Sequence, residues 1–328
     1  MQHIKMKAID VYHPKNQLNK AQYIEEFQEK GRDISNFLNI MGRENYYRIN
    51  NADENSVTMA IEASKKVLKK AELTGDEIDM VIFSSQVPEY TFPSNAIFVH
   101  QAIQGKKDCI VYDNNANCAG MTIAVEQASR YMMSSPHVVR ALIVGSDYLS
   151  LVANPEQEIT TANFGDAACA VILEKTDEET GFIDAIYETD SSFKDNILYP
   201  ANGFSQYMNK GEFLGYVDWK PFDGTVSLPY TFEKIQRLLE RNHYSMKDVA
   251  MCCFSQFALV NIQRIQEHFA IADEKIVYVG DEYGYTGTNS PFITMYEGIE
   301  SGKIKRGDLV LFWTIGGGHE FICMLFRY

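Results

Sequence analysis

The sequence has no apolar run long enough to cross a lipid bilayer. A membrane-spanning helix needs roughly 18–20 consecutive apolar residues, and no segment of this 328-residue chain approaches that length. The first residues, Met1 to Lys5, also lack the apolar core of a secretory leader. We therefore expect a cytoplasmic protein that has no membrane partner.

Spacings typical of metal, redox and nucleotide sites are missing as well. None of the six cysteines belongs to a Cys-x-x-Cys pair, and the seven histidines show no zinc-like spacing. The phosphate-binding loop Gly-x-x-x-x-Gly-Lys-(Ser/Thr) and the dinucleotide fingerprint Gly-x-Gly-x-x-Gly are absent. We therefore expect reduced thiols, no bound metal and no resident cofactor.

Positive charge is in short supply. The chain has 30 Lys and Arg residues against 44 Asp and Glu residues, which gives a formal net charge of −14 at pH 7. A chain with this balance repels nucleic acids and anionic membrane surfaces unless a local basic patch overrides it. The short cluster of Lys303, Lys305 and Arg306 is typical of a solvated loop. We expect no nucleic-acid partner.

Apolar runs of strand length alternate along the chain with amphipathic segments of helix length. Strands are predicted at residues 80–85, 109–112, 141–145, 168–173, 249–254, 309–313 and 320–326. Helices are predicted at residues 56–72, 119–131, 229–241 and 257–269. Continuous apolar strands that alternate with helices predict a layered α/β fold.

The chain divides into two halves of similar pattern. A polar, turn-rich stretch at residues 176–181 separates residues 1–175 from residues 176–328. Each half carries a strand that leads into a turn and then a helix, which predicts two duplicated α/β domains. Residues 190–228, rich in Gly, Asn, Tyr and Phe, fit neither period and predict a long loop or cap near a pocket.

Cys118 is the strongest candidate for a catalytic residue. Residues 113–120 join a predicted strand to an amphipathic helix, so Cys118 falls at a helix N-terminus. There the helix dipole and free N–H groups lower a thiol pKa and can hold an oxyanion. A free cysteine is more often a buried structural residue. The turn, with the small neighbours Ala119 and Gly120, favours a nucleophile.

Several segments resemble the β-ketoacyl-acyl-carrier-protein synthase III family, which has the thiolase fold. They are Phe92-Pro93-Ser94, Asn117-Cys118-Ala119-Gly120, Gly145-Ser146-Asp147, Phe164-Gly165-Asp166-Ala167-Ala168 and the stretch from Gly302 to Gly318. They occur in the family's order and span almost the whole chain. The resemblance implies a five-layer αβαβα arrangement and a homodimer. It places the nucleophile in residues 1–175 and the glycine-rich loop in residues 176–328.

The resemblance also implies an activity and a set of site residues. In that family the cysteine takes an acyl group from coenzyme A or an acyl carrier protein, in fatty acid or polyketide biosynthesis. By this likeness, Cys118 and Gly317 supply the N–H groups of an oxyanion hole. Phe92 closes the acyl pocket of the partner subunit, and Phe37 stands at the pantetheine entrance. The alternative for Gly317 is an ordinary turn glycine without a catalytic role. The alternative for Phe92 is a residue of the hydrophobic core.

Two positions depart from the family's pattern. Ser255 and Tyr285 stand where the family has the His and Asn that polarise the malonyl carbonyl during decarboxylation. A Ser hydroxyl cannot act as a base near neutral pH without help, and the Tyr285 ring can fill the malonyl site. Losing both groups should cost several kcal/mol of enolate stabilisation, at roughly 3–4 kcal/mol for one such donor. We therefore expect acyl transfer without ordinary decarboxylative condensation.

Other positions bear on the donor and on a substitute base. The family's coenzyme-stacking Trp-x-x-x-Arg segment corresponds to Phe37 and Met41, so the arginine is missing and a carrier-protein-bound donor is favoured. His319, after the glycine loop, is the better candidate for a substitute base, and Glu89 on the dimer loop is a second. The alternative for His319 is a packed or surface histidine without a catalytic role.

Three functions therefore stay open. The first is an acyltransferase that forms an acyl-thioester on Cys118. The second is a decarboxylative condensing enzyme with an atypical Cys/Ser/Tyr site at residues 118, 255 and 285. The third is a partly degenerate subunit of a heterodimeric ketosynthase, against which the intact nucleophile turn argues.

Overall fold

Two β-sheets form the framework of the molecule. The computed structural model describes residues 2–210 and 215–328. The first sheet has the order β1-β7-β6-β4-β5. Its strands are β1 (His3–Tyr12), β4 (Met80–Ser84), β5 (Ile110–Asn114), β6 (Arg140–Tyr148) and β7 (Asp166–Thr176). β4 pairs in parallel with β5 and β6, whereas β7 is antiparallel to β6 and β1.

The second sheet has four strands in the order β11-β12-β13-β8. Its strands are β8 (Gly181–Thr189), β11 (Met251–Phe254), β12 (Leu309–Gly316) and β13 (Glu320–Arg327). β11 pairs in parallel with β12, and the other pairs are antiparallel. Every residue of β4 and β11 is buried, which explains why these strands are apolar without alternation.

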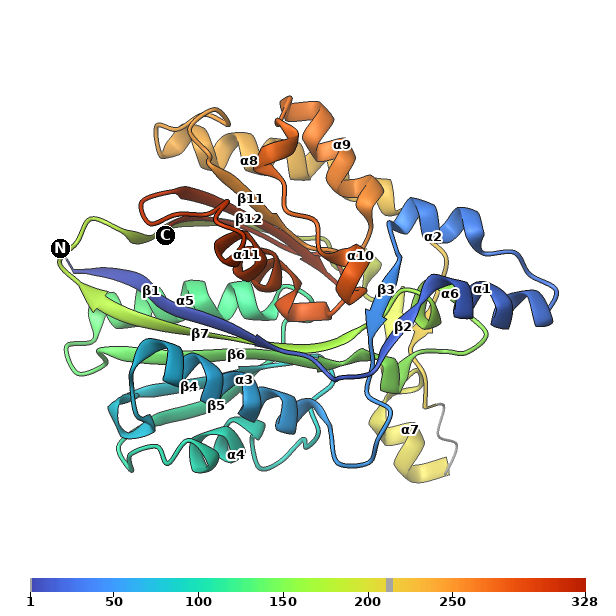
Figure 1. Ribbon diagram of the computed structural model, residues 1–328, viewed down its shortest axis with the longest axis horizontal. Helices are drawn as coiled ribbons and strands as arrows, with labels where there is room; N and C mark the ends of the chain where they lie inside the picture. The colour runs from blue at the N-terminus through green and yellow to red at the C-terminus, as the bar shows by residue number, and fades with distance from the viewer. Residues whose placement is uncertain (1, 211–214) are drawn as a thin grey trace.

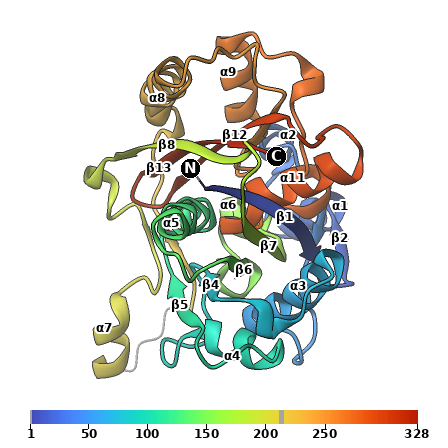
Figure 2. The ribbon, with the colours of Figure 1, turned by 90° about the vertical axis from the view of Figure 1, so that its left-hand side faces the viewer.

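Helices lie between the sheets and on both outer faces (Figures 1 and 2). α3 (Ser56–Ala71) and α4 (Asn95–Ala102) cover the outer face of the first sheet. α5 (Gly120–Ser134) and α11 (Ser290–Glu300) lie between the sheets, and α8 (Leu228–Arg241) and α9 (Leu259–Phe269) cover the second. The five-layer αβαβα arrangement is thereby confirmed.

A smaller set of elements lies at one end of the layers. It contains α1 (Lys20–Glu29), α2 (Ser35–Met41), the paired strands β2 (Gln17–Asn19) and β3 (Asn45–Tyr47), α6 (Glu158–Thr161) and α10 (Gly280–Tyr283). The side chain of Asn19 begins α1 by accepting hydrogen bonds from two backbone N–H groups. α2 contacts α9, so this end joins the N-terminal segment to the second sheet's helices.

The predicted strands and helices are all present, with ends that differ by a few residues. The predictions missed β1, β8 and α11. α11 is buried around most of its circumference, because it lies between the sheets, and so it lacks the amphipathic stripe that marks a surface helix. The division into domains at residues 175 and 176 stays a prediction. In the residues that the structure describes, no helix is long and apolar enough to cross a membrane.

The predicted loop at residues 190–228 contains short elements. These are β9 (Ile197–Leu198), α7 (Gly203–Lys210), β10 (Asp218–Trp219) and the 3₁₀ turn η4 (Gly224–Ser227). β9 and β10 pair with each other as a small separate sheet. Residues 211–214 of this prediction lie outside the described residues.

Candidate active site

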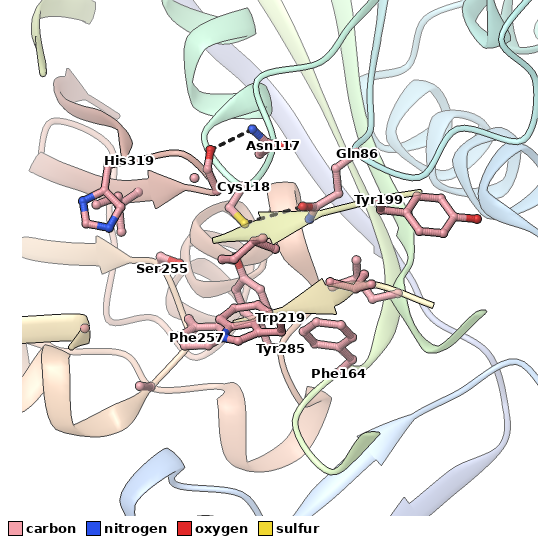
Figure 3. A pocket seen from close by; sticks show the side chains of 18 of the residues that line it. Gln86, Asn117, Cys118, Phe164, Tyr199, Trp219, Ser255, Phe257, Tyr285 and His319 are labelled. Carbon is pink, nitrogen blue, oxygen red and sulfur yellow. Dashed lines mark hydrogen bonds between the residues drawn. The ribbon is translucent and has the colours of Figure 1, made fainter. Parts of the chain in front are cut away.

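Cys118 opens onto a cavity of about 200 Å³ that lies where the two halves of the chain meet (Figure 3). β5 ends at Asn114, and a tight turn closed by two backbone hydrogen bonds leads into α5. A side chain at Gly120 would lie only 2.5 Å from Ser84 Oγ, so this helix start needs a glycine to pack against β4. The fold thus places the thiol at the N-terminus of α5, as the sequence predicts.

Asn117 couples the nucleophile turn to the glycine loop. Its φ of 50° is left-handed, a conformation that Asn tolerates better than most residues. Its side-chain Nδ2 donates to the carbonyl oxygen of Gly317 and to Glu320 Oε2, at 3.1 Å in each case. These bonds hold the loop after β12 against the turn, and Gly317 and Cys118 line the same cavity.

The thiol of Cys118 is shielded from bulk water. Burial raises its pKa to about 11, although the neighbouring Tyr285, Gln86 and Gly317 act in the opposite direction. The nearby Asp147 carboxylate also raises this pKa. Burial thus acts against the lowering of the thiol pKa that the helix N-terminus predicts. At neutral pH Cys118 is a protonated thiol.

Ser255 and Tyr285 meet beside Cys118, although they lie far from it in the sequence. Ser255 follows β11 and is held by its N–H, which donates to the Trp313 carbonyl at 2.8 Å. Both side chains are buried and line the cavity. Burial is the main cause that holds the pKa of the Tyr285 hydroxyl well above the ordinary range. Tyr285 is therefore a neutral phenol that lines the cavity together with Cys118 and Ser255.

The segment around Gly165 fixes the backbone of Tyr285. Tyr285 N–H donates to the Asn163 carbonyl, and Gly165 N–H donates to the Tyr285 carbonyl, both at 2.8 Å. A Cβ atom on Gly165 would lie 2.0 Å from the Tyr283 carbonyl oxygen. The glycine of the Phe-Gly-Asp segment is therefore needed for a close backbone approach.

Replacing Gly165 with alanine is expected to lower the free energy of unfolding by about 1–3 kcal/mol, since the backbone at Tyr283 must move. Urea unfolding measures the change. Gly224→Ala is the matched control, because its Cβ would have no neighbour within 4 Å. Equal stability of the two variants would contradict the close packing.

Aromatic rings form much of the cavity wall. Trp219 and Phe257 stack face to face, with ring centroids 5.2 Å apart. Phe257 meets Tyr285 edge to face at 5.2 Å, and Phe164 packs near both Tyr285 and Trp219. Trp219 comes from residues 190–228, which also contribute Ile197, Tyr199, Val217 and Phe222 to the wall. The prediction that this stretch lies beside a pocket is confirmed.

The proposed substitute bases do not contact the thiol. His319 lines the cavity, but its ring stacks on Phe193 at 3.8 Å and its Nδ1 is 3.0 Å from the Tyr230 hydroxyl. Burial lowers the pKa of His319, which favours the neutral ring. Glu89 is exposed and lies outside the cavity wall. A role for either as a base stays a prediction.

Phe92 and Phe37 lie away from the cavity of this chain. Phe92 is 85% exposed on the loop before α4, so its predicted contact needs a second subunit. Phe37 is half-buried on α2 and packs with a cluster that includes Leu38 and Tyr46. Both predicted roles stay predictions. In the described ranges, 2–210 and 215–328, no group of three or more His, Cys, Asp or Glu side chains could hold a metal ion.

Arg43 is a structural residue that the sequence did not reveal. It is 1% exposed and donates to neutral acceptors only, among them the Asn163 side chain at 2.7 Å and the carbonyls of Phe257 and Gly280 at 2.8 and 3.0 Å. Phe257 and Gly280 belong to the segments that carry Ser255 and Tyr285, and the Asn163 carbonyl accepts from the Tyr285 N–H. Arg43 thus links those segments through hydrogen bonds.

Replacing Arg43 with methionine is expected to lower the free energy of unfolding by about 3 kcal/mol or more, because several buried acceptors lose their donor. Urea unfolding of the two forms measures this loss. Arg237→Met serves as the control, since Arg237 is exposed on α8 and its replacement should change the free energy of unfolding by less than about 1 kcal/mol. An equally small loss of stability in Arg43→Met would contradict the role of Arg43 in holding these segments together.

Comparisons with known proteins agree with this geometry. Residues 112–191 match the family model for 3-oxoacyl-[acyl-carrier-protein (ACP)] synthase III, and residues 239–328 match the model for its C-terminal region. The β-ketoacyl-[acyl-carrier-protein] synthase III of Solibacter usitatus is 30% identical over 277 residues, which cover 82% of this chain and 83% of that protein. The Clostridium perfringens strain 13 enzyme of the same name is 29% identical over 324 residues, 97% of each chain.

Solved structures show the same likeness. The crystal structure of 3-oxoacyl-[acyl-carrier-protein] synthase III from Aquifex aeolicus VF5 superposes with a TM-score of 0.86 and 25% sequence identity. The superposition covers 99% of this chain and 100% of that one. The chain therefore belongs to the β-ketoacyl-[acyl-carrier-protein] synthase III family.

Proposed function

We propose that this protein is an acyltransferase that takes an acyl group from coenzyme A or an acyl carrier protein and holds it as a thioester on Cys118. One observation carries the proposal. The Cys118 sulfur lies at the N-terminus of α5 and faces a largely apolar cavity, whose wall also includes Gly317 and Tyr285. A structural cysteine has no need of an open space in front of its sulfur.

The loading step exchanges one thioester for another. The Cys118 sulfur attacks the donor's carbonyl carbon, a new S–C bond forms, and the donor's C–S bond breaks. The thiol proton ends on the departing sulfur, so the exchange is balanced without another reactant. The Gly317 N–H is proposed to stabilise the developing oxyanion, as such donors do. Tyr285 is proposed to pass the proton, because its neutral phenol lines the same cavity as the sulfur.

The second step is proposed to be transfer to an acceptor without decarboxylation of a malonyl group. Ser255 and Tyr285 are neutral donors, and neither carries the positive charge that a protonated histidine can supply. The Tyr285 ring also occupies space, since it packs against Phe164 and Phe257. A condensing enzyme is the second candidate, and the hydroxyls of Ser255 and Tyr285 favour it, because both line the cavity beside the thiol.

The experiment is to incubate the purified protein with acyl-coenzyme A and acyl carrier proteins of several chain lengths and to weigh it intact. A mass increase equal to the acyl group supports loading, and absence of an adduct with every donor would overturn the proposal. Loaded protein is then given malonyl carrier protein. Release of carbon dioxide would favour the condensing enzyme. Activity only in the presence of a homologous synthase would favour the subunit of a heterodimer.

The quaternary structure and the place of action belong to the same proposal. A homodimer is proposed, and a heterodimer with a homologous synthase is the alternative, with fatty acid or specialised polyketide biosynthesis in the cytoplasm as the setting. The strongly exposed Phe92 supports a partner subunit at that loop. The mass of the assembly in solution distinguishes a monomer from either dimer.

A further inference from the structure

Gln86 contacts the nucleophile from the side opposite the second sheet, on the segment that follows β4 (Figure 3). The Cys118 Sγ donates to Gln86 Oε1 across 3.7 Å. The other end of the same amide, Nε2, donates to Asp147 Oδ2 at 3.0 Å. Gln86 therefore bridges the thiol and a carboxylate that is fully buried at the end of β6.

Asp147 accepts hydrogen bonds on both carboxylate oxygens. Oδ1 accepts from the Ser85 hydroxyl and the Gln86 backbone N–H, both at 2.9 Å. Oδ2 accepts from the Thr288 N–H at 2.9 Å and from Gln86 Nε2. All four partners donate hydrogen bonds to Asp147, which suits a charged carboxylate. If Asp147 were protonated, none of these four donors would be oriented to accept its proton. Burial raises the pKa of Asp147, and these four bonds oppose that change.

A carboxylate in this position decides which way the Gln86 amide points. If the amide were turned over, its carbonyl oxygen would face the Asp147 carboxylate, and two acceptors would meet in a buried place. The backbone keeps this pair close. Gly287, in the 3₁₀ turn η6 (Gly287–Asn289), has a φ of 71°, and a Cβ there would lie 2.2 Å from Asp147 Oδ2 and 2.6 Å from Gln86 Nε2.

We infer that Asp147 fixes the Gln86 amide so that its carbonyl oxygen holds the thiol proton of Cys118, which makes Gln86 a positioning residue that keeps the resting thiol neutral and aimed. The inference rests on the proposed function, in which Cys118 is the nucleophile. Its consequence is selectivity. A protonated thiol reacts slowly with alkylating agents and oxidants in general, whereas a thioester donor seated in the cavity offers a leaving sulfur that accepts the proton.

Other titratable groups lie near the sulfur and must be considered in any pH profile. Tyr285 contacts it from the segment before η6. His319 lines the same cavity from the glycine loop, with its ring against Phe193. Glu320, at the start of β13, lies behind the nucleophile turn, where Asn117 donates to it. The test therefore changes Gln86 and Asp147 and leaves these groups in place.

The experiment measures the rate of iodoacetamide alkylation at Cys118 against pH, by intact mass, in a background in which Cys109 is replaced by alanine. The midpoint for the unchanged site is expected near pH 11. Gln86→Met keeps the side-chain length but removes the amide. Because the contact with Asp147 turns the amide oxygen toward the thiol, the midpoint should fall by about half a pH unit or more. A rise would mean that Gln86 lowers the thiol pKa and would overturn the inference. Asp147→Asn removes a nearby negative charge and frees the amide to turn, so the midpoint should fall by about one unit or more.

The combination of the two substitutions separates a turned amide from a simple loss of charge. In the Gln86→Met background the Asp147→Asn shift should shrink, because no amide remains to donate to the thiolate. Ser150→Ala is the matched control. It removes a hydroxyl donor from the other fully buried carboxylate in this half, Asp166, and should lower stability without moving the midpoint. An unchanged midpoint in Gln86→Met, or a higher one in Asp147→Asn, would overturn the inference.

Two readouts keep this test separate from that of the proposed function. If Asp147→Asn does not fold, the alkylation midpoint of Gln86→Met alone still tests the inference. Alkylation needs no substrate, so this readout does not depend on acyl loading. In Gln86→Met we also expect kcat for acyl loading to fall while KM is unchanged, because the sulfur is no longer held in place. If the unchanged protein takes an acyl group from no donor, the proposed function fails, but the alkylation profile still tests Gln86.

Discussion

Replacing Cys118 with alanine is expected to abolish the acyl adduct, with a loss of loading rate of about a thousandfold or more. The physical reason is that the acyl group bonds to the sulfur itself, so the remaining donors have nothing to act on. The measurement is intact mass after incubation with acyl-coenzyme A or an acyl carrier protein. The variant should fold normally, because alanine fits wherever cysteine does and Cys118 makes only a weak thiol hydrogen bond.

The chain offers a closely matched control in Cys109. This residue is the other cysteine that is not fully buried, and burial raises its pKa to about 11 as well. It differs from Cys118 because its thiol is bonded only to a neighbouring backbone carbonyl and does not line the cavity. Cys109→Ala should therefore keep the full adduct. An adduct that persists in Cys118→Ala and is lost in Cys109→Ala would place the chemistry elsewhere.

The sequence could predict the parts of the fold that have a regular pattern. β4 and β11 are short, fully buried strands, and they stand out as apolar runs. α8 has a strongly one-sided distribution of apolar residues and was predicted to within one residue. α11 could not be found in this way, because burial on most sides removes the periodicity. The order of the five layers came from the family resemblance, since local pattern does not fix which sheet a helix covers.

Cys118 could be predicted from its place in a turn before a helix, whereas Ser255 and Tyr285 came from the family resemblance. The three residues line one cavity. Gln86 and Asp147 could not be assigned a role, because a role for either depends on a contact between segments 61 residues apart. The thiol pKa was also out of reach, because the helix dipole can be read from the sequence and the depth of burial cannot.

The paired substitution of Ser255 by His and Tyr285 by Asn is expected to raise decarboxylative condensation above that of the unchanged protein. Two polarising groups would return to the enolate, each worth roughly 3–4 kcal/mol, so carbon dioxide release should rise by about two orders of magnitude or more. Both changes are needed together. The Tyr285 hydroxyl contacts Ser255 in a buried place, so a histidine alone would meet the tyrosine ring.

The measurement is carbon dioxide release from labelled malonyl carrier protein after the variant has been loaded with an acyl group. If the gain in carbon dioxide release depends on the new histidine, its rate should also vary with pH. The midpoint should lie near the ordinary histidine pKa of about 6.5. Tyr285→Phe is the control, because it keeps the ring against Phe164 and Phe257 but gains no polar group. The asparagine side chain is smaller than the tyrosine that it replaces and leaves a cavity beside those rings, so the paired variant should also lose about 3–5 kcal/mol of stability. A folded, loaded variant that releases no more carbon dioxide than the unchanged protein would show that Ser255 and Tyr285 are not what prevents condensation.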